Sequence, residues 1–256
     1  MIHKARKRFG QNFLQDVQII DRMVNALRLD AADQVVEVGP GLGALTLPLI
    51  NHLDQLHVVE IDRDLIEKLK RRQLAGLHIH GEDVLGFNFR ELSTDNRLRI
   101  VGNLPYNIGT PLLLRLLECH DALRDVHVML QKEVVDRLAA QPNTRAFGRL
   151  SVLMQSVFAI EPLFTVPAEA FSPAPKVQSS VVRLTPLADP ADAGLIDALQ
   201  VCTRIAFSAK RKTLRNNVKG HVNDDALSEI GIDPQARAET LDLPAFHRLA
   251  KLLSDA

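Results

Sequence analysis

The sequence contains no tryptophan, a single tyrosine and only two cysteines among its 256 residues. The cysteines, Cys119 and Cys202, stand alone, with no Cys-x-x-Cys pair and no His/Cys cluster at the spacing of a zinc site. This excludes a scaffold held together by disulfides and indicates reduced thiols in a cytosolic setting. We expect no structural metal site.

Long apolar runs are also absent. No uninterrupted apolar stretch approaches the length that spans a bilayer, and the basic start of the chain is not followed by the apolar core of a signal peptide. We therefore expect a cytoplasmic protein with no membrane partner. A hydrophobic content of 46% is enough to fill the core of one large domain and an appendage.

The chain has no net charge, but its charges are unevenly distributed. Residues 1–15 hold four Lys or Arg and no acid, and residues 203–221 hold six and again no acid. Two such segments in a neutral chain indicate a surface that binds a polyanion. A solvated helix face would explain the same charges. The candidate contacts are Arg6, Arg8, Lys210, Arg211, Lys212 and Arg215.

Apolar runs rich in β-branched residues alternate with segments of helical character. This alternation predicts an α/β fold with a mostly parallel sheet. The runs cover residues 34–38, 56–61, 77–80, 98–101 and 126–130. Two later runs, 160–166 and 177–184, have a short proline-rich connection that suits an antiparallel hairpin at the sheet edge.

The composition changes after Pro186, where a linker-like stretch leads into leucine-marked short helices. We therefore expect a catalytic or ligand-binding domain over residues 1–187 and a small helical domain over 188–256.

The sole tyrosine lies in the tetrapeptide Asn103-Leu104-Pro105-Tyr106, directly after one of the apolar runs. The carboxyl ends of parallel strands form the ligand-binding edge of an open α/β sheet. An Asn amide oxygen accepts from an exocyclic amino group, proline stiffens the turn, and a tyrosine ring offers a flat face to a base. The tetrapeptide predicts an adenine-holding turn, although an ordinary strand-to-helix loop has a similar composition.

The first strand ends in a glycine-rich turn, Gly39-Pro40-Gly41-Leu42-Gly43, preceded by the acid Glu37. This G-x-G-x-G spacing differs from the dinucleotide fingerprint, and an embedded proline beside an acid suits a pyrophosphate poorly. Glu60, which follows the second strand, can accept from both ribose hydroxyls, and Asp83, which follows the third, can accept from an adenine amino group. A surface acid and a helix cap are the alternatives for these two residues.

His78 and His80 share a strand face without a third metal ligand, so we interpret them as structural.

With these motifs the chain resembles the S-adenosylmethionine-dependent rRNA adenine N6,N6-dimethyltransferases, especially their small-subunit branch. The similarity runs nearly end to end, which makes it specific. The segments that carry it are residues 8–14 (RFGQNFL), 38–43 (VGPGLG), 103–107 (NLPYN), 130–134 (LQKEV), 171–177 (FSPAPKV) and 210–216 (KRKTLRN).

The resemblance implies a Rossmann-like class I methyltransferase domain with a small C-terminal helical RNA-binding domain, working as a monomer on small-subunit (16S) rRNA within an immature ribosomal subunit. It implies that Tyr106 and Phe171 sandwich the target adenine while Asn103 and Leu104 accept from its amino group. The implied contacts of S-adenosylmethionine are Gln11, Asn12, Leu14, Gly39, Gly41, Glu60, Asp83 and Asn103.

Three other functions are compatible with parts of this pattern. A large-subunit (23S) rRNA methyltransferase shares most of the motifs. A non-catalytic ribosome-assembly or transcription factor has less need of an intact glycine turn, Glu60 and Asn103. An NAD-dependent oxidoreductase requires the dinucleotide glycine spacing and a hydride-site acid or base, which the sequence lacks.

Overall fold

The computed structural model describes residues 11–93 and 96–255. The chain forms two compact units. The first unit runs to Val135 and resumes over Glu161–Pro186, and the second consists of Asp136–Ile160 and the chain from Leu187 onward.

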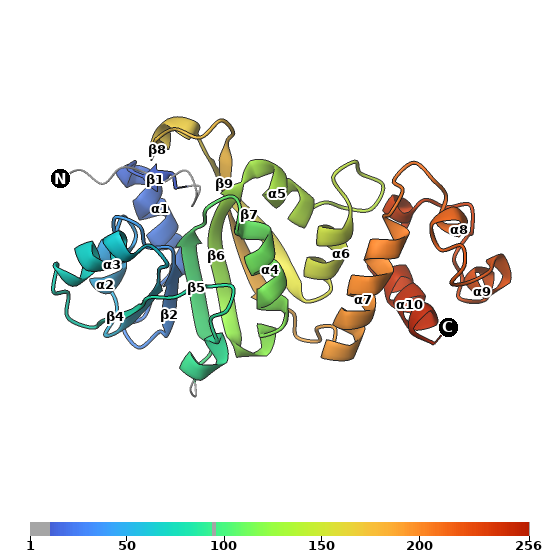
Figure 1. Ribbon diagram of the computed structural model, residues 1–256, viewed down its shortest axis with the longest axis horizontal. Coiled ribbons are helices and arrows are strands. Elements are labelled where there is room, and N and C mark those ends of the chain that lie inside the picture. The colour runs from blue at the N-terminus through green and yellow to red at the C-terminus, as the bar shows by residue number, and fades with distance from the viewer. Residues whose placement is uncertain (1–10, 94–95, 256) are drawn as a thin grey trace. The chain divides into compact units, whose positions relative to one another are not determined.

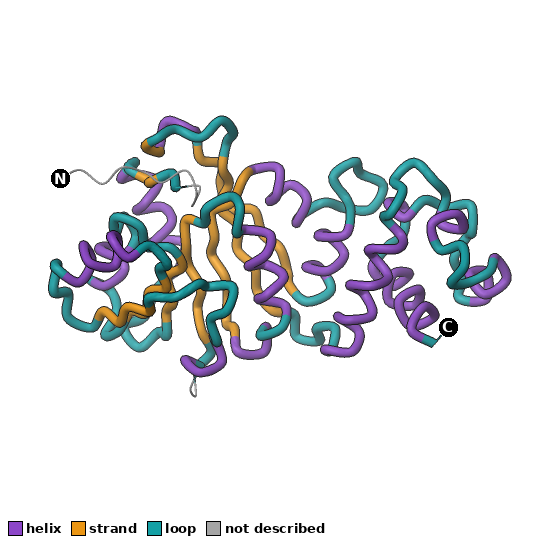
Figure 2. Tube along the Cα trace, in the orientation of Figure 1, coloured by secondary structure: helices purple, strands orange, loops and turns teal. Residues whose placement is uncertain are grey.

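The first unit is built on a seven-stranded sheet with the order β4-β3-β2-β5-β6-β9-β7 (Figures 1 and 2). Strands β2 to β6 are parallel, and β9 joins β6 in the antiparallel direction. The predicted α/β fold with a mostly parallel sheet is therefore confirmed. The strands are β2 (Val35–Val38), β3 (Leu56–Val59), β4 (Leu77–His80), β5 (Leu98–Asn103), β6 (Leu123–Gln131), β7 (Phe158–Val166) and β9 (Ser179–Pro186).

The centre of this sheet is buried on both faces. Val35, Val36 and Ile100 have no exposed surface, which explains why β2 and β5 read as continuous apolar runs. β2 and β5 approach closely, and a Cβ at Gly102 would lie 2.6 Å from the Val38 carbonyl oxygen. Glycine at this position lets the two central strands pair up to their carboxyl ends.

Helices connect the strands and cover the sheet. The α-helices are α1 (Val17–Leu27), α2 (Thr46–Ile50), α3 (Arg63–Lys70), α4 (Gly109–Leu117), α5 (Lys132–Leu138), α6 (Arg149–Gln155), α7 (Ala193–Ala206), α8 (Leu214–Asn217), α9 (Asp224–Glu229) and α10 (Leu243–Ser254). Asp16 caps α1 by accepting from the backbone N–H groups of Gln18 and Ile19, which fixes where this helix begins. Within residues 11–93 and 96–255, no helix combines the length and apolar character needed to cross a membrane.

A second, two-stranded sheet was not expected from the sequence. Strands β1 (Phe13–Leu14) and β8 (Phe171–Ser172) pair antiparallel, with Leu14 opposite Phe171 (Figure 1). The backbone N–H groups of Gln15 and Asp16 extend this contact to the Ala170 carbonyl oxygen. Two motifs that are about 160 residues apart in sequence thus lie side by side.

The second unit is helical. Helix α6 packs against α7 and α10, and Phe207 stacks on Phe246 with 5.6 Å between ring centroids. Because α6 lies in this packing, residues 136–160 belong to the second unit together with the chain that follows Pro186. This division by contacts differs from the expected boundary near residue 188, and the roles expected for residues 1–187 and 188–256 remain predictions.

Candidate active site

A cavity of about 250 Å³ lies in the first unit at the carboxyl edge of the parallel strands. It opens between β2 and β5, where the strand order changes direction, which is the ordinary ligand position in open α/β sheets. Every residue that the sequence predicts for the cofactor or the target base lines it. These residues are Gln11, Asn12, Leu14, Gly39, Gly41, Glu60, Asp83, Asn103, Leu104, Tyr106 and Phe171.

The glycine-rich turn after β2 forms one wall of the cavity. Gly39 and Gly41 have φ angles of 67° and 58°, a region that side-chain-bearing residues rarely adopt. A Cβ at Gly41 would also lie 3.2 Å from the Phe13 ring. Glycine therefore shapes a backbone wall that an organic ligand can approach closely.

Glu60 follows β3 and is 7% exposed. Its Oε1 accepts from the Asp62 backbone N–H at 2.9 Å, and its Oε2 accepts from the Gly41 N–H at 3.3 Å. Burial raises the pKa of this carboxyl, although the two N–H groups act in the opposite direction. Each carboxylate oxygen retains a second acceptor position, so Glu60 can hold the glycine turn and still bind ligand hydroxyl groups.

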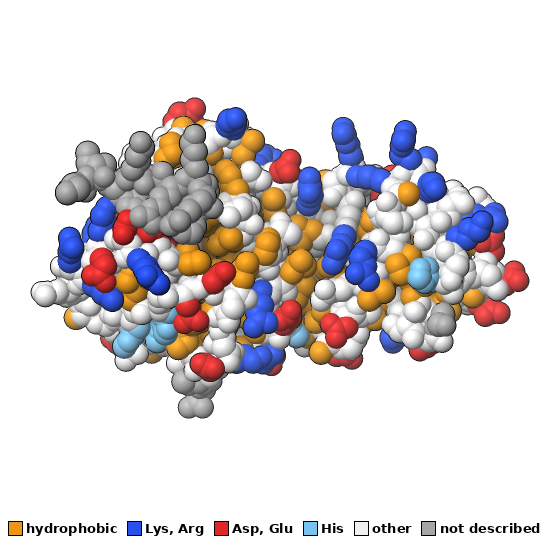
Figure 3. All heavy atoms as spheres, in the orientation of Figure 1, with side chains coloured by type: hydrophobic (Ala, Val, Ile, Leu, Met, Phe, Trp, Pro, Cys, Tyr) orange, Lys and Arg blue, Asp and Glu red, His pale blue; other side chains and the backbone are white. Residues whose placement is uncertain are grey.

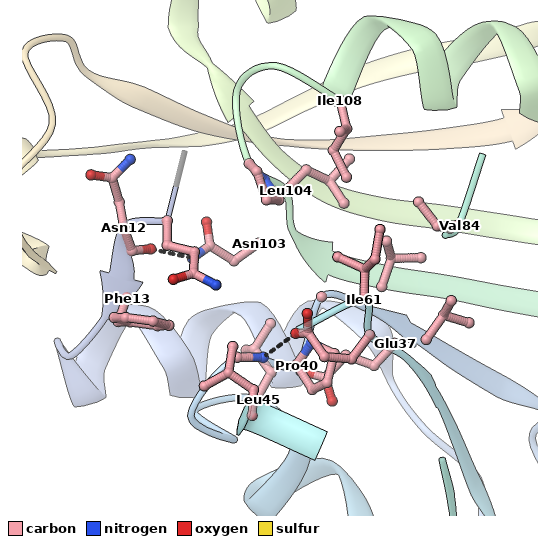
Figure 4. Close-up of a pocket in the computed structure, with 18 of the residues that line it drawn as sticks. Asn12, Phe13, Glu37, Pro40, Leu45, Ile61, Val84, Asn103, Leu104 and Ile108 are labelled. Carbon is pink, nitrogen blue, oxygen red and sulfur yellow. Dashed lines mark hydrogen bonds between the residues drawn. The ribbon is translucent and has the colours of Figure 1, made fainter. Parts of the chain in front are cut away.

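Glu37, at the end of β2, was not predicted as a site residue but also lines the cavity (Figure 4). It is 1% exposed, and its Oε2 accepts from the Thr46 hydroxyl at 2.6 Å. Burial raises the pKa of Glu37 from its ordinary value of 4.5 to about 8, and the nearby Glu60 contributes to the shift. An acid inside an otherwise apolar strand was the sequence signal for this residue.

The raised pKa of Glu37 makes the stability of the first unit depend on pH. Its contribution is complete below 4.5 and is lost as the pH rises through that value toward about 8. Glu37→Gln retains an acceptor for Thr46 but cannot ionise. We expect the variant to gain unfolding free energy relative to the wild type as the pH rises through this window. Urea unfolding at several pH values measures the difference, and a constant difference would contradict the assignment.

Asn103 ends β5, and its side-chain amide is held in one orientation. Its Nδ2 donates to the Asn12 carbonyl oxygen at 3.0 Å (Figure 4). Because Nδ2 is engaged with the backbone, Oδ1 is the end of the amide that is left to accept from a ligand. The backbone of the adjacent Leu104 is fixed as well, because its N–H donates to the Met129 carbonyl oxygen at 3.2 Å.

Tyr106 and Phe171 line the cavity together with a third aromatic residue, Phe13. Tyr106 is half-buried, and its phenol oxygen lies 2.8 Å from the Ser179 hydroxyl at the start of β9. Phe171 is 5% exposed and is placed by the pairing of β8 with β1. The two rings come from distant parts of the chain, as the resemblance implies.

Two further predicted residues have local partners. Gln11 Nε2 donates to the Asp62 carboxylate at 3.2 Å, which connects the start of the described chain to the segment after Glu60. Asp83 is exposed, and its Oδ1 accepts from the Leu85 N–H at 3.0 Å. The carboxylate of Asp83 therefore stabilises its own turn and retains an oxygen for a ligand.

The histidines on β4 have a third imidazole nearby, that of His57, which the sequence did not indicate. His57 on β3 stacks on His78, and its Nδ1 lies 3.0 Å from His80 Nε2. Burial and the two neighbouring rings lower the pKa of His57 to about 4. Across residues 11–93 and 96–255, no cluster of three or more His, Cys, Asp or Glu has the geometry of a metal site.

The four basic candidates at 210–215 lie in the second unit and are exposed. Figure 3 shows Lys and Arg side chains, in blue, on the surface of this unit. Two of the four candidates have protein partners. Lys210 Nζ donates to the Arg145 carbonyl oxygen at 2.7 Å, and Arg215 pairs with Asp224 at 3.2 Å. Arg6 and Arg8, the other two candidates, lie outside the described residues.

The parallel sheet, its antiparallel strand β9 and a cavity walled by a glycine turn define a class I methyltransferase. Residues 2–255 match the family described as ribosomal RNA adenine dimethylase. The chain belongs to this family, so the family expectation from the sequence is confirmed.

Relatives agree with this assignment, and a solved structure shares the fold. The chain is 50% identical over 255 residues to the ribosomal RNA small subunit methyltransferase A of Neisseria gonorrhoeae (strain ATCC 700825 / FA 1090), covering 99% of this chain and 98% of the relative. It is 52% identical to the protein of the same name from Laribacter hongkongensis (strain HLHK9), covering 95% and 94%. A dimethyladenosine transferase from Plasmodium falciparum has a similar fold, with a TM-score of 0.80 at 24% identity over 93% of this chain and 95% of that one.

Proposed function

We propose that this protein transfers methyl groups from S-adenosylmethionine to the N6 amino groups of two adjacent adenosines in the 3′-terminal hairpin loop of small-subunit (16S) rRNA, giving N6,N6-dimethyladenosine. The observation that carries the proposal is the fixed amide of Asn103, which presents Oδ1 in the same cavity as Glu60 and the glycine turn. The names of the small-subunit relatives support the choice of RNA.

The donor set of the cavity fits S-adenosylmethionine. The buried acid Glu60 suits a ligand that carries positive charge and ribose hydroxyls, and its carboxylate would repel a pyrophosphate. The glycine turn gives close backbone approach. In this proposal Glu60 accepts from the ribose, Asp83 accepts from the adenine amino group, and the segment from Gln11 to Leu14 closes over the ligand.

When bound, S-adenosylmethionine supplies an electrophilic methyl group on a sulfonium. The protein's task is to aim the amino nitrogen of the target. That nitrogen has its lone pair delocalised into the adenine ring, and acceptors at Asn103 Oδ1 and the Leu104 carbonyl favour a pyramidal, more nucleophilic geometry. The N–C bond forms as the S–C bond breaks with its electron pair passing to sulfur, and a proton leaves the nitrogen for solvent. Positioning of this kind lowers the activation free energy by several kcal/mol.

The target base reaches such a cavity only when it is unstacked, because its reacting edge is inaccessible within a duplex. Tyr106 and Phe171 hold it between their rings in this proposal, and stacking on one aromatic side chain is worth ~1–3 kcal/mol per base. The exposed basic residues of the second unit contact RNA phosphates. We further propose that the partner is an immature small ribosomal subunit and that the enzyme acts as a cytoplasmic monomer.

Two alternatives follow from the same fold. The 23S rRNA methyltransferase ErmE has a TM-score of 0.70 at 23% identity, over 95% of this chain and 100% of that one, and this likeness concerns the fold alone. A large-subunit substrate is the second candidate because large-subunit rRNA methyltransferases share most of the sequence motifs. A non-catalytic assembly factor is the third.

A methyl-transfer assay separates the three candidate functions. It is run with immature small subunits, with intact large-subunit rRNA and without RNA. We expect labelled methyl groups on the small subunits only, mapped as dimethyladenosine in the 3′-terminal loop. Transfer to large-subunit RNA would favour the second candidate. RNA binding without transfer would favour the third.

Arg211 and Lys212 test the basic surface, because both are exposed and neither forms an ion pair of the kind that Arg215 forms with Asp224 among the residues that the structure describes. We expect Arg211→Ala combined with Lys212→Ala to weaken binding of the RNA substrate and to reduce the salt slope by about 2, because two fewer phosphates are neutralised. Affinity for S-adenosylhomocysteine should stay unchanged. Arg215→Ala, which removes a residue already paired with an acid, is the matched control with a smaller effect. An unchanged salt dependence would make the segment a solvated helix face.

A further inference from the structure

Ser179 is buried beside the cavity without lining it. It is the first residue of β9, lies opposite Gln131 at the carboxyl end of β6 and has no exposed surface. Because β9 runs antiparallel to β6, its first residue lies at the ligand-binding edge of the sheet. A hydroxyl buried there requires a hydrogen-bond partner.

Among the described residues, the structure gives the Ser179 hydroxyl one partner, the phenol oxygen of Tyr106 at 2.8 Å. The Tyr106 ring is therefore held at both ends, by the backbone turn that follows Asn103 and by Ser179. The phenol hydroxyl is engaged with the protein, so the part of Tyr106 that faces a ligand is its ring. A stacking platform works best when its plane is fixed before the base arrives.

We infer that Ser179 is a positioning residue for methyl transfer: its hydroxyl locks the plane of Tyr106 so that the target base stacks in a reactive orientation. The inference rests on the proposed function and adds a residue that contacts neither the cofactor nor the base. It also assigns the Tyr106 hydroxyl to orientation of the ring and not to chemistry.

The adjacent Ser180 provides a matched control on the same strand. It is 5% exposed, and its hydroxyl donates to the Phe164 carbonyl oxygen at 3.0 Å. Successive residues of a strand point to opposite faces, so Ser180→Ala removes a comparable buried hydrogen bond without touching Tyr106.

The test is a double-mutant cycle of Ser179→Ala and Tyr106→Phe, read by single-turnover methyl transfer to immature small subunits. Each single change removes one hydrogen bond, so we expect each to slow transfer about two- to tenfold. The double variant should be no slower than the slower single variant, because both changes break the same bond. Affinity for S-adenosylhomocysteine should change less than about twofold, or ~0.4 kcal/mol, in all of them, because neither side chain is assigned to the cofactor.

A second readout does not depend on activity. The near-ultraviolet circular dichroism of tyrosine comes from Tyr106 alone, since it is the only tyrosine and there is no tryptophan. We expect Ser179→Ala to weaken this band and Ser180→Ala to leave it intact. An unchanged band, or losses of rate that multiply in the double variant, would overturn the inference. If the wild type transfers no methyl groups, the proposed function fails, while the dichroism still tests the Ser179 contact.

Discussion

Replacing Arg99 by methionine is expected to destabilise the first unit by about 3–5 kcal/mol, because it leaves carboxylates buried without their cation. Arg99 is the second residue of β5 and is 3% exposed. Its guanidinium donates to Asp125 at 2.7 and 3.0 Å, to Asp33 at 2.7 Å and to the Leu27 carbonyl oxygen at 2.5 Å. It thereby joins β5 and β6 to the end of α1. Urea unfolding followed by Tyr106 emission reports on this unit.

Arg124→Met is the matched control. Arg124 also pairs with Asp33, at 2.6 Å, but its side chain is 52% exposed, so its loss should change the unfolding free energy by less than about 1 kcal/mol. Equal effects of the two changes would contradict the role of burial.

The same network predicts an acid dependence. Burial acts to raise the pKa of Asp33 and of Asp125. Hydrogen bonds and the positive charge of Arg99 outweigh burial, with His127 contributing at Asp125, so both pKa values lie below their ordinary range. The stabilisation is complete above the ordinary carboxyl pKa and is lost as the pH falls through the lowered values. The unfolding free energy of Arg99→Met should therefore fall less steeply with decreasing pH than that of the wild type.

Glu60→Ala is expected to weaken binding of S-adenosylhomocysteine about 10- to 150-fold, the equivalent of ~1.5–3 kcal/mol for hydrogen bonds to a charged group. The change removes the proposed ribose acceptor and also the carboxylate that holds the Gly41 and Asp62 N–H groups. Glu60→Gln, which retains an acceptor oxygen, should lie between the wild type and the alanine variant. Isothermal calorimetry on the folded proteins measures all three.

Glu67→Ala provides the charge control for this series. Glu67 is an exposed acid on α3 that pairs with Lys70 at 3.3 Å and does not line the cavity. The Glu67→Ala variant should bind S-adenosylhomocysteine with the affinity of the wild type. If Glu60→Ala bound S-adenosylhomocysteine as tightly as Glu67→Ala, the ribose assignment would be wrong.

The sequence predicted the parts of this molecule that depend on local pattern. Apolar runs located the parallel strands because buried strands need them, and the residues after those runs met at one edge because parallel strands end together. The sequence alone therefore placed Glu60, Asp83 and Asn103 around one site, and all three line the cavity. Their roles in binding remain predictions.

Contacts between distant residues could not be predicted in this way. β1 and β8 have two residues each, too few to show a period, and only tertiary pairing defines them. The partnership of Tyr106 with Ser179 spans 73 positions and depends on where β9 begins. Arg99 and Asp125 did carry a signal, because charged residues inside apolar strands are buried only when paired. The ion pair of Arg215 with Asp224 carried no such signal, because both side chains are exposed. Its effect is to neutralise part of the basic segment.

The division of the chain into two units also decides which fragments of this protein can be made. The chain passes from one unit to the other at residues 135, 160 and 186, so the helical unit is not a continuous stretch of sequence. A fragment that ended at residue 187 would keep α6 but lose α7 and α10, which cover it. Val152, Leu153 and Met154, all buried in the complete protein, would then face water. A stable fragment of the first unit requires replacement of residues 136–160 by a short linker as well as removal of the C-terminal helices.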